Sequence, residues 1–266
     1  MQKISDILGY EPIDMHSHLD YGVPGDRTDV IEPWEENVHF CDINFLKVEY
    51  DNVGISHGAF CTFSSVIRTD RILIENDYMY SLLDMNPWMR QWVVIHPEQE
   101  ETFYQAEKLL KDPRVVGIKI HPSNHGYDIL KWGDKLFSFA NDLGATIMMH
   151  PIEERAMSDF ANRYPDMRLI IAHLADEKFV DAMLGAKHGN IFADTSGGAS
   201  CKNNVVEYAV KRVGAEKILF GTDTYSTAFQ LGRIAWARIP DEDKYKILRG
   251  NALAMFQEGF DGEARK

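Results

Sequence analysis

The chain has 266 residues, of which 45% are hydrophobic and 26% charged, as is typical of one large globular domain spanning residues 1–266. The formal net charge of −13 disfavours a nucleic-acid partner, because the phosphate backbone would be repelled. The N-terminus lacks the pattern of a signal peptide, and no apolar run reaches the ~20 residues of a spanning helix. We therefore expect a cytoplasmic protein without membrane contact. Three cysteines without paired spacing indicate reduced thiols.

Eight short apolar or β-branched segments are predicted as strands, and amphipathic helical segments separate most of them. The strands are expected at residues 13–18, 52–62, 92–96, 115–121, 146–150, 169–173, 191–195 and 218–223. The clearest helices are expected at residues 98–111, 129–143, 153–164, 178–187, 203–213 and 241–256. Residues 20–51 are rich in Pro, Gly and acidic side chains, which favours a long loop over the barrel mouth with a short helix near residues 38–48.

The alternation of strand and helix predicts an α/β fold, a distorted parallel (β/α)8 TIM barrel. The competing α/β fold is a doubly wound open sheet. That fold would need a glycine-rich phosphate loop after the first strand, where this chain has Ser17-His18-Leu19-Asp20. The barrel is therefore the predicted architecture.

Polar side chains stand at or near the ends of nearly all the predicted strands. His16 and His18, two residues apart on the first strand, project from one face and can reach one cation, and such a pair suits zinc or another late first-row metal. The carboxyl ends of barrel strands meet at one mouth, so a shared site is expected there. The remaining members are His57, His96, Lys119, His121, His150, His173 and Asp223.

The ordered set of strand-end motifs resembles the amidohydrolase superfamily. The resemblance is to the amidohydrolase 2 branch, the metal-dependent hydrolases related to aminocarboxymuconate-semialdehyde decarboxylase, and it covers residues 13–256. The motifs are Asp14-Met15-His16-Ser17-His18, Gly117-Ile118-Lys119-Ile120-His121-Pro122, Met149-His150-Pro151, Ile171-Ala172-His173-Leu174, Ala193-Asp194-Thr195-Ser196-Gly197 and Leu219-Phe220-Gly221-Thr222-Asp223.

The resemblance implies that His16, His18, His150 and Asp223 hold one divalent metal ion, for which zinc is expected. Three imidazoles and one carboxylate leave an open position for water, as in catalytic sites. His173 would be a catalytic imidazole outside the ligand set. Asp223 would also be catalytic, taking the proton of the attacking water and passing it to the leaving group.

Lys119 is expected to share a strand face with His121 and to point into the mouth. One interpretation makes Lys119 a carbamylated lysine that bridges two metal ions, as in some relatives. The favoured interpretation makes it an anchor for a substrate carboxylate, and a purely structural lysine is the third. His121 and His57 are predicted to line the substrate pocket.

The sequence therefore predicts a metal-dependent hydrolase in which a metal-bound hydroxide attacks an amide, ester or lactone of a small anionic substrate. The first alternative is a metal-dependent non-oxidative decarboxylase or hydratase on the same barrel, because this branch contains both. A catalytically silent barrel that binds a ligand is the second. A homodimer is one expectation for the assembly.

Overall fold

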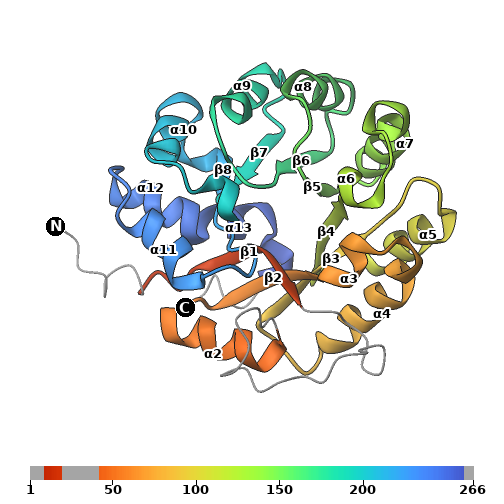
Figure 1. The fold of residues 1–266 in the computed structure, drawn as a ribbon, viewed down its shortest axis with the longest axis horizontal. Helices are drawn as coiled ribbons and strands as arrows, with labels where there is room; N and C mark the ends of the chain where they lie inside the picture. Colours follow the sequence, from red (N-terminus) through yellow and green to blue (C-terminus); the bar gives the residue numbers. More distant parts are fainter. Residues whose placement is uncertain (1–8, 20–41, 261–266) are drawn as a thin grey trace.

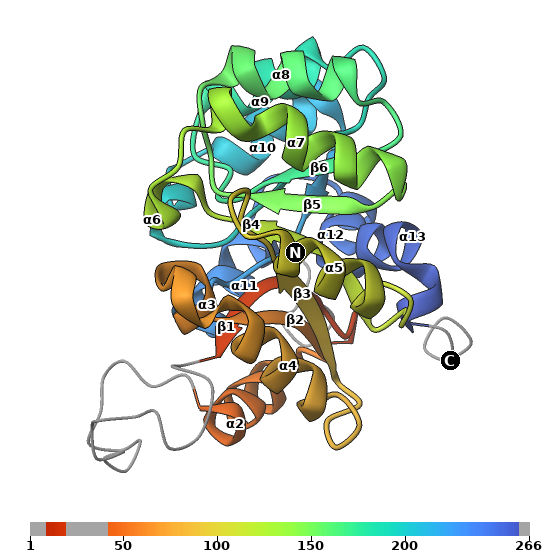
Figure 2. The ribbon, with the colours of Figure 1, turned by 90° about the vertical axis from the view of Figure 1, so that its right-hand side faces the viewer.

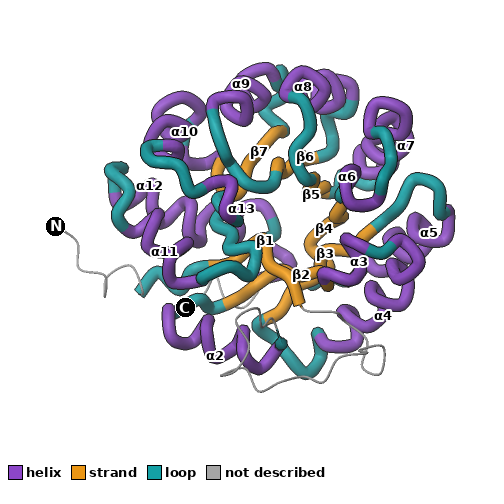
Figure 3. Tube along the Cα trace, viewed as in Figure 1, coloured by secondary structure: helices purple, strands orange, loops and turns teal. Residues whose placement is uncertain are grey.

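Eight parallel strands form the centre of the protein in the computed structural model, which describes residues 9–19 and 42–260. Each strand pairs in parallel with the next, in the order β1 to β8, and the helices surround the strands (Figures 1 and 3). The predicted (β/α)8 barrel is confirmed. The strands are β1 (Ile13–Leu19), β2 (His57–Thr62), β3 (Met89–Val94), β4 (Val115–Ile120), β5 (Thr146–Met149), β6 (Arg168–Ile171), β7 (Ile191–Asp194) and β8 (Ile218–Leu219).

The first strand and the segment that ends with β8 close the barrel through backbone hydrogen bonds. The N–H of Met15 donates to the carbonyl of Phe220 at 2.9 Å. The N–H groups of Thr222 and Asp223 both donate to the carbonyl of His16, at 3.2 and 2.7 Å. This closure places the residues after β8 directly beside the end of β1.

Capping residues mark the ends of several helices. Asp42, Asp128 and Asp176 cap the starts of α2, α7 and α9 by accepting backbone N–H bonds. Gly144 follows α7 with φ +60°, a left-handed conformation that favours glycine. The helices are α2 (Ile43–Val53), α3 (Phe63–Ile67), α4 (Ile72–Leu82), α5 (Glu100–Leu109), α6 (Pro122–His125), α7 (Ile129–Asp142), α8 (Glu154–Arg163), α9 (Glu177–Gly185), α10 (Val205–Val213), α11 (Thr227–Ala235), α12 (Asp241–Tyr245) and α13 (Asn251–Met255).

Two sets of buried side chains fill the interior. Alternate strand residues such as Trp92, Met148 and Ile170 form the inner set, while their sequence neighbours pack against the helices. Phe256 lies edge-on to Trp92, with ring centroids 5.8 Å apart. Figure 2 shows α3 and α6 on one side of the barrel and α13 on the other. Because α3 and α6 follow strands directly, their side is the carboxyl end of the barrel.

The second strand and its surroundings differ from the expectation. Residues 52 and 53 end α2, Gly54 caps it with φ +74°, and β2 begins only at His57. The short helix predicted near residues 38–48 is found as α2, five residues later in the chain. Residues 20–41, most of the predicted mouth loop, lie outside the described residues. Within the described part, no helix combines the length and apolar character needed to cross a lipid bilayer.

Candidate active site

Asp14 fixes the backbone from which the site is built. Its Oδ1 accepts the N–H bonds of His16 and Thr222, at 3.0 and 3.1 Å. Its Oδ2 accepts the hydroxyls of Thr222 and Tyr50, at 2.5 and 2.6 Å. A side chain with no solvent exposure thus joins β1, the segment after β8 and α2. These four bonds hold the paired histidines of β1 against the loop that carries Asp223.

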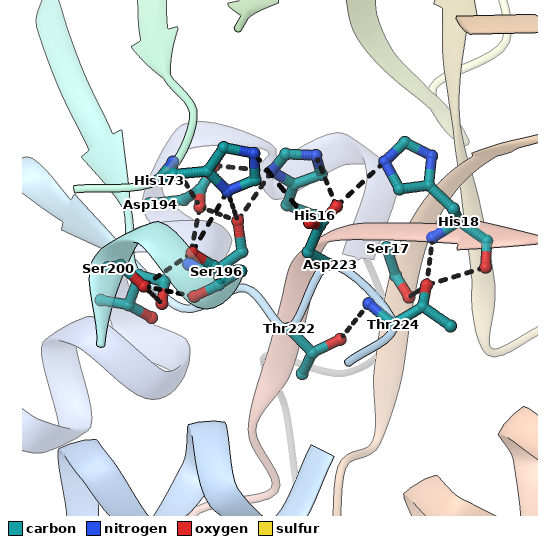
Figure 4. Close-up of polar contacts among 12 residues, drawn as sticks. His16, Ser17, His18, His173, Asp194, Ser196, Ser200, Thr222, Asp223 and Thr224 are labelled. Carbon is teal, nitrogen blue, oxygen red and sulfur yellow. Dashed lines mark hydrogen bonds and ion pairs between the residues drawn. The ribbon is translucent and has the colours of Figure 1, made fainter. Parts of the chain in front are cut away.

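The Asp223 carboxylate lies between the rings of His16 and His18, with His173 beyond His16 (Figure 4). Asp223 Oδ1 is 3.2 Å from His18 Nε2 and 3.6 Å from His16 Nε2, and Oδ2 is 4.0 Å from His173 Nε2. Burial alone would raise the pKa of Asp223, but the hydrogen bond from His18 and the charges of the imidazoles lower it below its ordinary value. Asp223 is therefore a carboxylate at neutral pH.

Two of these residues hold a backbone conformation that L residues rarely adopt. His173 has φ +64° and Asp223 has φ +59°. Such conformations cost of order 1–3 kcal/mol and persist where surrounding contacts enforce them, which occurs most often at functional sites. The ring of His173 stacks on that of His16, with centroids 5.0 Å apart.

The outer ring nitrogens of the three imidazoles all have partners. His16 Nδ1 lies 2.9 Å from Asp194 Oδ2, His173 Nδ1 lies 2.9 Å from the hydroxyl of Ser196, and His18 Nδ1 lies 3.3 Å from the Cys61 sulfur. Each Nε2 is thereby directed towards Asp223. Ligand atoms of His16, His173 and Asp223 all lie within 4.8 Å of one another. Such outer partners are typical of metal-ligating histidines, so the donor set fits a divalent cation.

His150 reaches the same mouth but lies further along it. Its ring is 5.0 Å from that of His173 and stacks on His121 at 4.2 Å. Burial, followed by the nearby His173, lowers the pKa of His150 to about 4, so the imidazole is neutral and able to ligate at pH 7. The compact group with His16 and Asp223 thus contains His173 in place of the predicted His150.

Lys119 points at the first metal-ligand candidate. Only 1% of the residue is exposed, and Nζ lies 2.8 Å from His16 Nε2. Because Asp194 holds the other nitrogen, Nε2 is the acceptor and the lysine donates. Burial lowers the pKa of Lys119, and burial together with the Lys119 charge lowers the pKa of His16 to about 3. His121, two residues on, accepts the N–H of Asn124 at 3.3 Å and thereby caps the start of α6.

The prediction that His57 lines the substrate pocket is wrong. His57 is the first residue of β2 and pairs with Ile13 at the start of β1, whereas His18 pairs with Cys61 at the other end. The His57 ring stands edge-on to Phe260, with centroids 5.5 Å apart. Residues 52–56, assigned to this strand from sequence, end α2 and connect it to β2, so the strand starts at His57. His57 therefore lies at the amino end of the barrel, away from the site.

Asp194, Ser196 and Cys61 contact the site histidines. Asp194 and Cys61 were not predicted site residues, and Ser196 was predicted only as a candidate substrate contact. Asp194 stood in the sequence as part of the motif on the seventh strand. Cys61 was interpreted as an ordinary reduced thiol. The position of Asp194 at a strand end was the available signal, since it repeats the pattern of His173 and Asp223.

A second group of buried polar side chains lies after β3 and β4. The His96 ring is 5.5 Å from the ring of His125 and 5.4 Å from that of Tyr127. His125 Nε2 donates to the carbonyl of Ser65 at 2.9 Å. Within the described ranges, His125 Nδ1 and the Tyr127 hydroxyl have no hydrogen-bond partner. Only 8% of His125 is exposed.

The burial of His125 predicts a loss of stability in mild acid. Burial lowers its pKa to about 4, against about 6.5 for an unfolded chain, so only the unfolded state takes up this proton near pH 5. The free energy of unfolding should therefore fall by about 2 kcal/mol through this group between pH 7.5 and 5. Urea unfolding of metal-free protein at pH 7.5 and 5 measures this. The free energy of unfolding should fall by less in His125→Gln than in the wild type. Equal falls in both proteins would contradict the assignment.

The comparisons with known proteins agree with this geometry. The family model described as Amidohydrolase matches residues 13–257. The chain belongs to the amidohydrolase family. Among curated proteins, none matches the sequence.

Solved structures of amidohydrolase-like barrels share the fold at low sequence identity. A 5-carboxyvanillate decarboxylase from Sphingomonas paucimobilis is 15% identical with a TM-score of 0.71, covering 93% of this chain and 99% of that one. A dihydroxybenzoic acid decarboxylase from a Polaromonas species, solved with manganese and an inhibitor, is 16% identical with a TM-score of 0.70, covering 92% and 96%. A probable 2-pyrone-4,6-dicarboxylic acid hydrolase from Acinetobacter baumannii is 16% identical with a TM-score of 0.63, covering 93% and 99%.

Proposed function

We propose that this amidohydrolase-family chain is a metal-dependent enzyme that acts on a small anionic substrate, with Asp223 and His173 moving the proton. The observation that carries the proposal is the convergence of three imidazoles, each with its outer nitrogen occupied, on one carboxylate. A purely structural cluster would not need three histidines aimed through Nε2 at the same atoms.

His16, His18 and Asp223 would hold the cation, with His150 as the fourth ligand. A bound divalent cation would polarise a substrate oxygen and acidify a water molecule. The nitrogen-rich donor set suits zinc, and manganese is the alternative that the Polaromonas structure supports. His18 would have to lose its proton first. Burial alone would lower the pKa of His18, but Cys61 and Asp223 raise it to about 9.

The proton-handling residues would be Asp223 and His173. Asp223 faces the His18 and His16 rings through Oδ1 and keeps its second oxygen 4.0 Å from His173 Nε2. A carboxylate and an imidazole at this separation can pass a proton between attacking and leaving groups. Lys119 and His121 would bind a substrate carboxylate. Lys119 Nζ, which now donates to His16 Nε2, would turn to that anion once the cation occupies Nε2, and the anion would favour its protonated form.

Two reactions use this arrangement. Hydrolysis at an amide, ester or lactone needs a proton taken from water and delivered to the leaving group. Non-oxidative decarboxylation needs a proton delivered to carbon, and the solved decarboxylases that share this fold favour it as a second candidate. A screen of carboxylate-bearing lactones, amides and aromatic acids in ¹⁸O water decides between them. Hydrolysis places ¹⁸O in the organic product, whereas decarboxylation releases carbon dioxide and adds no ¹⁸O to the organic product.

Removing divalent cations should abolish turnover and lower the melting temperature. A cation at about 100 times its Kd stabilises the folded state by about 2.7 kcal/mol, so thermal melts report binding without any substrate. Elemental analysis should find one equivalent per chain, whereas a carbamylated Lys119 would bring two. His150→Ala should weaken binding more than His173→Ala, and the reverse order would make His173 the ligand. Full activity in chelator would overturn the metal assignment.

A further inference from the structure

The end of β7 presents a carboxylate and a hydroxyl directly behind the site. Neither Asp194 nor Ser196 is exposed to solvent. Asp194 Oδ2 faces His16 Nδ1 at 2.9 Å. Asp194 Oδ1 accepts the backbone N–H groups of Ser196 at 2.8 Å and of His173 at 3.2 Å, and it also accepts the Ser196 hydroxyl. One carboxylate oxygen therefore serves the imidazole, while the other is held by three donors.

The Ser196 hydroxyl stands between two imidazoles. Its Oγ is 2.9 Å from His173 Nδ1 and 2.9 Å from His16 Nδ1. Because this hydroxyl donates its hydrogen to Asp194, it can only accept from an imidazole N–H. His173 Nδ1–H donates to it, and His16 Nδ1–H donates to Asp194. Both rings thereby carry their proton on Nδ1 and leave the lone pair of Nε2 free to accept, which in His16 receives Lys119 Nζ at 2.8 Å.

We propose that Asp194 and Ser196 are positioning residues that fix the tautomer and orientation of His16 and His173 together. The inference rests on the proposed function for its consequence, because a lone pair on Nε2 is what a cation or a transferred proton requires. Asp194 and Ser196, which are hydrogen-bonded to each other, thus orient both the metal-binding imidazole of His16 and the proton-handling imidazole of His173.

Asp194→Asn gives the sharpest test, because the three fixed donors leave the amide little choice of orientation. The amide oxygen must occupy the Oδ1 position to accept them, so the amide NH₂ faces His16 Nδ1. A donor at that place forces the His16 proton onto Nε2, where it points into the site. The same tautomer error accounts for the large loss when the aspartate of a serine-protease triad becomes asparagine.

The tautomers are measured first, in metal-free protein, by imidazole ¹⁵N NMR. His16 should be protonated on Nδ1 in the wild type and on Nε2 in Asp194→Asn. A His16 that stays protonated on Nδ1 in the folded variant would overturn the proposal. Should Asp194→Asn not fold, Ser196→Ala serves, since it keeps the bond between Asp194 and His16. It should change the His173 signals and spare those of His16, and unchanged His173 signals would equally overturn the proposal.

Metal titrations with Zn²⁺ and Mn²⁺ then measure the consequence. Loss of an outer partner typically costs 10–100-fold in metal affinity, and we expect that weakening for Asp194→Asn. Asp112→Asn is the matched control, because Asp112 also accepts several bonds, from Arg114 and Tyr80, but lies away from the site. Its affinity should equal that of the wild type, and an equal loss in both variants would count against positioning. Wild-type protein that binds no cation would refute the proposed function, while the tautomer measurement would still test the positioning.

Discussion

Asp223→Asn is expected to lower turnover by about 10²–10⁴-fold, the usual contribution of a positioned acid or base. The amide keeps the shape of the side chain but cannot take up a proton at neutral pH. It also replaces a charged ligand oxygen with a neutral one, so metal affinity should fall as well. Turnover and metal affinity, measured on the same preparation, check both effects.

The backbone at this position makes Asn a clean replacement. Asp223 has φ +59°, in the left-handed region of backbone conformation. After glycine, asparagine is among the residues that adopt this region most readily. The fold should therefore survive, which near-ultraviolet circular dichroism can verify. Asp84→Asn, whose side chain is 82% exposed, is the control and should retain full turnover. A folded Asp223→Asn enzyme with undiminished turnover would remove Asp223 from the reaction.

Gly197→Ala should reduce turnover by about 10²-fold, although the change is a single methyl group. A Cβ at this position would lie 2.7 Å from His173 Nδ1, closer than packed atoms allow, and 3.1 Å from Asp223 Oδ2, which is tighter than most packed contacts. Both catalytic candidates would have to shift, and a misplacement of about 1 Å can cost 10²-fold in rate. The measurement is kcat beside the free energy of unfolding.

Gly144→Ala is the control for a methyl group at a positive φ without a steric clash. Gly197 has φ +71° and ψ 169°, a conformation nearly confined to glycine, whereas Gly144 has φ +60°. Alanine should therefore strain the backbone at both positions by about 1–3 kcal/mol, and more at Gly197. A Cβ at Gly144 would meet no atom within 4 Å. Stability should therefore fall in both variants and turnover only in Gly197→Ala. Equal turnover in the two variants would show that Gly197 does not shape the site.

Much of the barrel was predictable because its strands and most of its helices have clear periodicity. Among the helices of the described residues, four were not predicted: the short α3 and α6 and the longer α4 and α11. α4 shows why. It exposes Leu73 and Ile74 while it buries Glu75 and Asn76, so its hydrophobic pattern does not mark the buried face. α11 begins after Ser226, which has φ +50° and makes no side-chain capping hydrogen bond, so the usual start signal is missing. Contacts with the rest of the protein, rather than local sequence patterns, therefore determine that α4 and α11 are helical.

The candidate site was predictable as a set of strand-end residues but not as a geometry. His16, His18, His173 and Asp223 meet because parallel strands share one carboxyl end. Strand order alone could not place His150 against His121, nor direct Lys119 Nζ to His16. Those contacts depend on side-chain rotamers and on where each strand stops. His57 failed because a strand boundary was set five residues too early.

The closure of the barrel also dictates when the site comes into being. Asp14 and Thr222 are 208 positions apart, and their bonds bring the two ends of the barrel together. A ribosome must therefore synthesise the chain through Asp223 before its carboxylate can join the early histidines. Under the proposed function, a nascent chain lacks the assembled site, so it could bind the cation only after its final strand has docked.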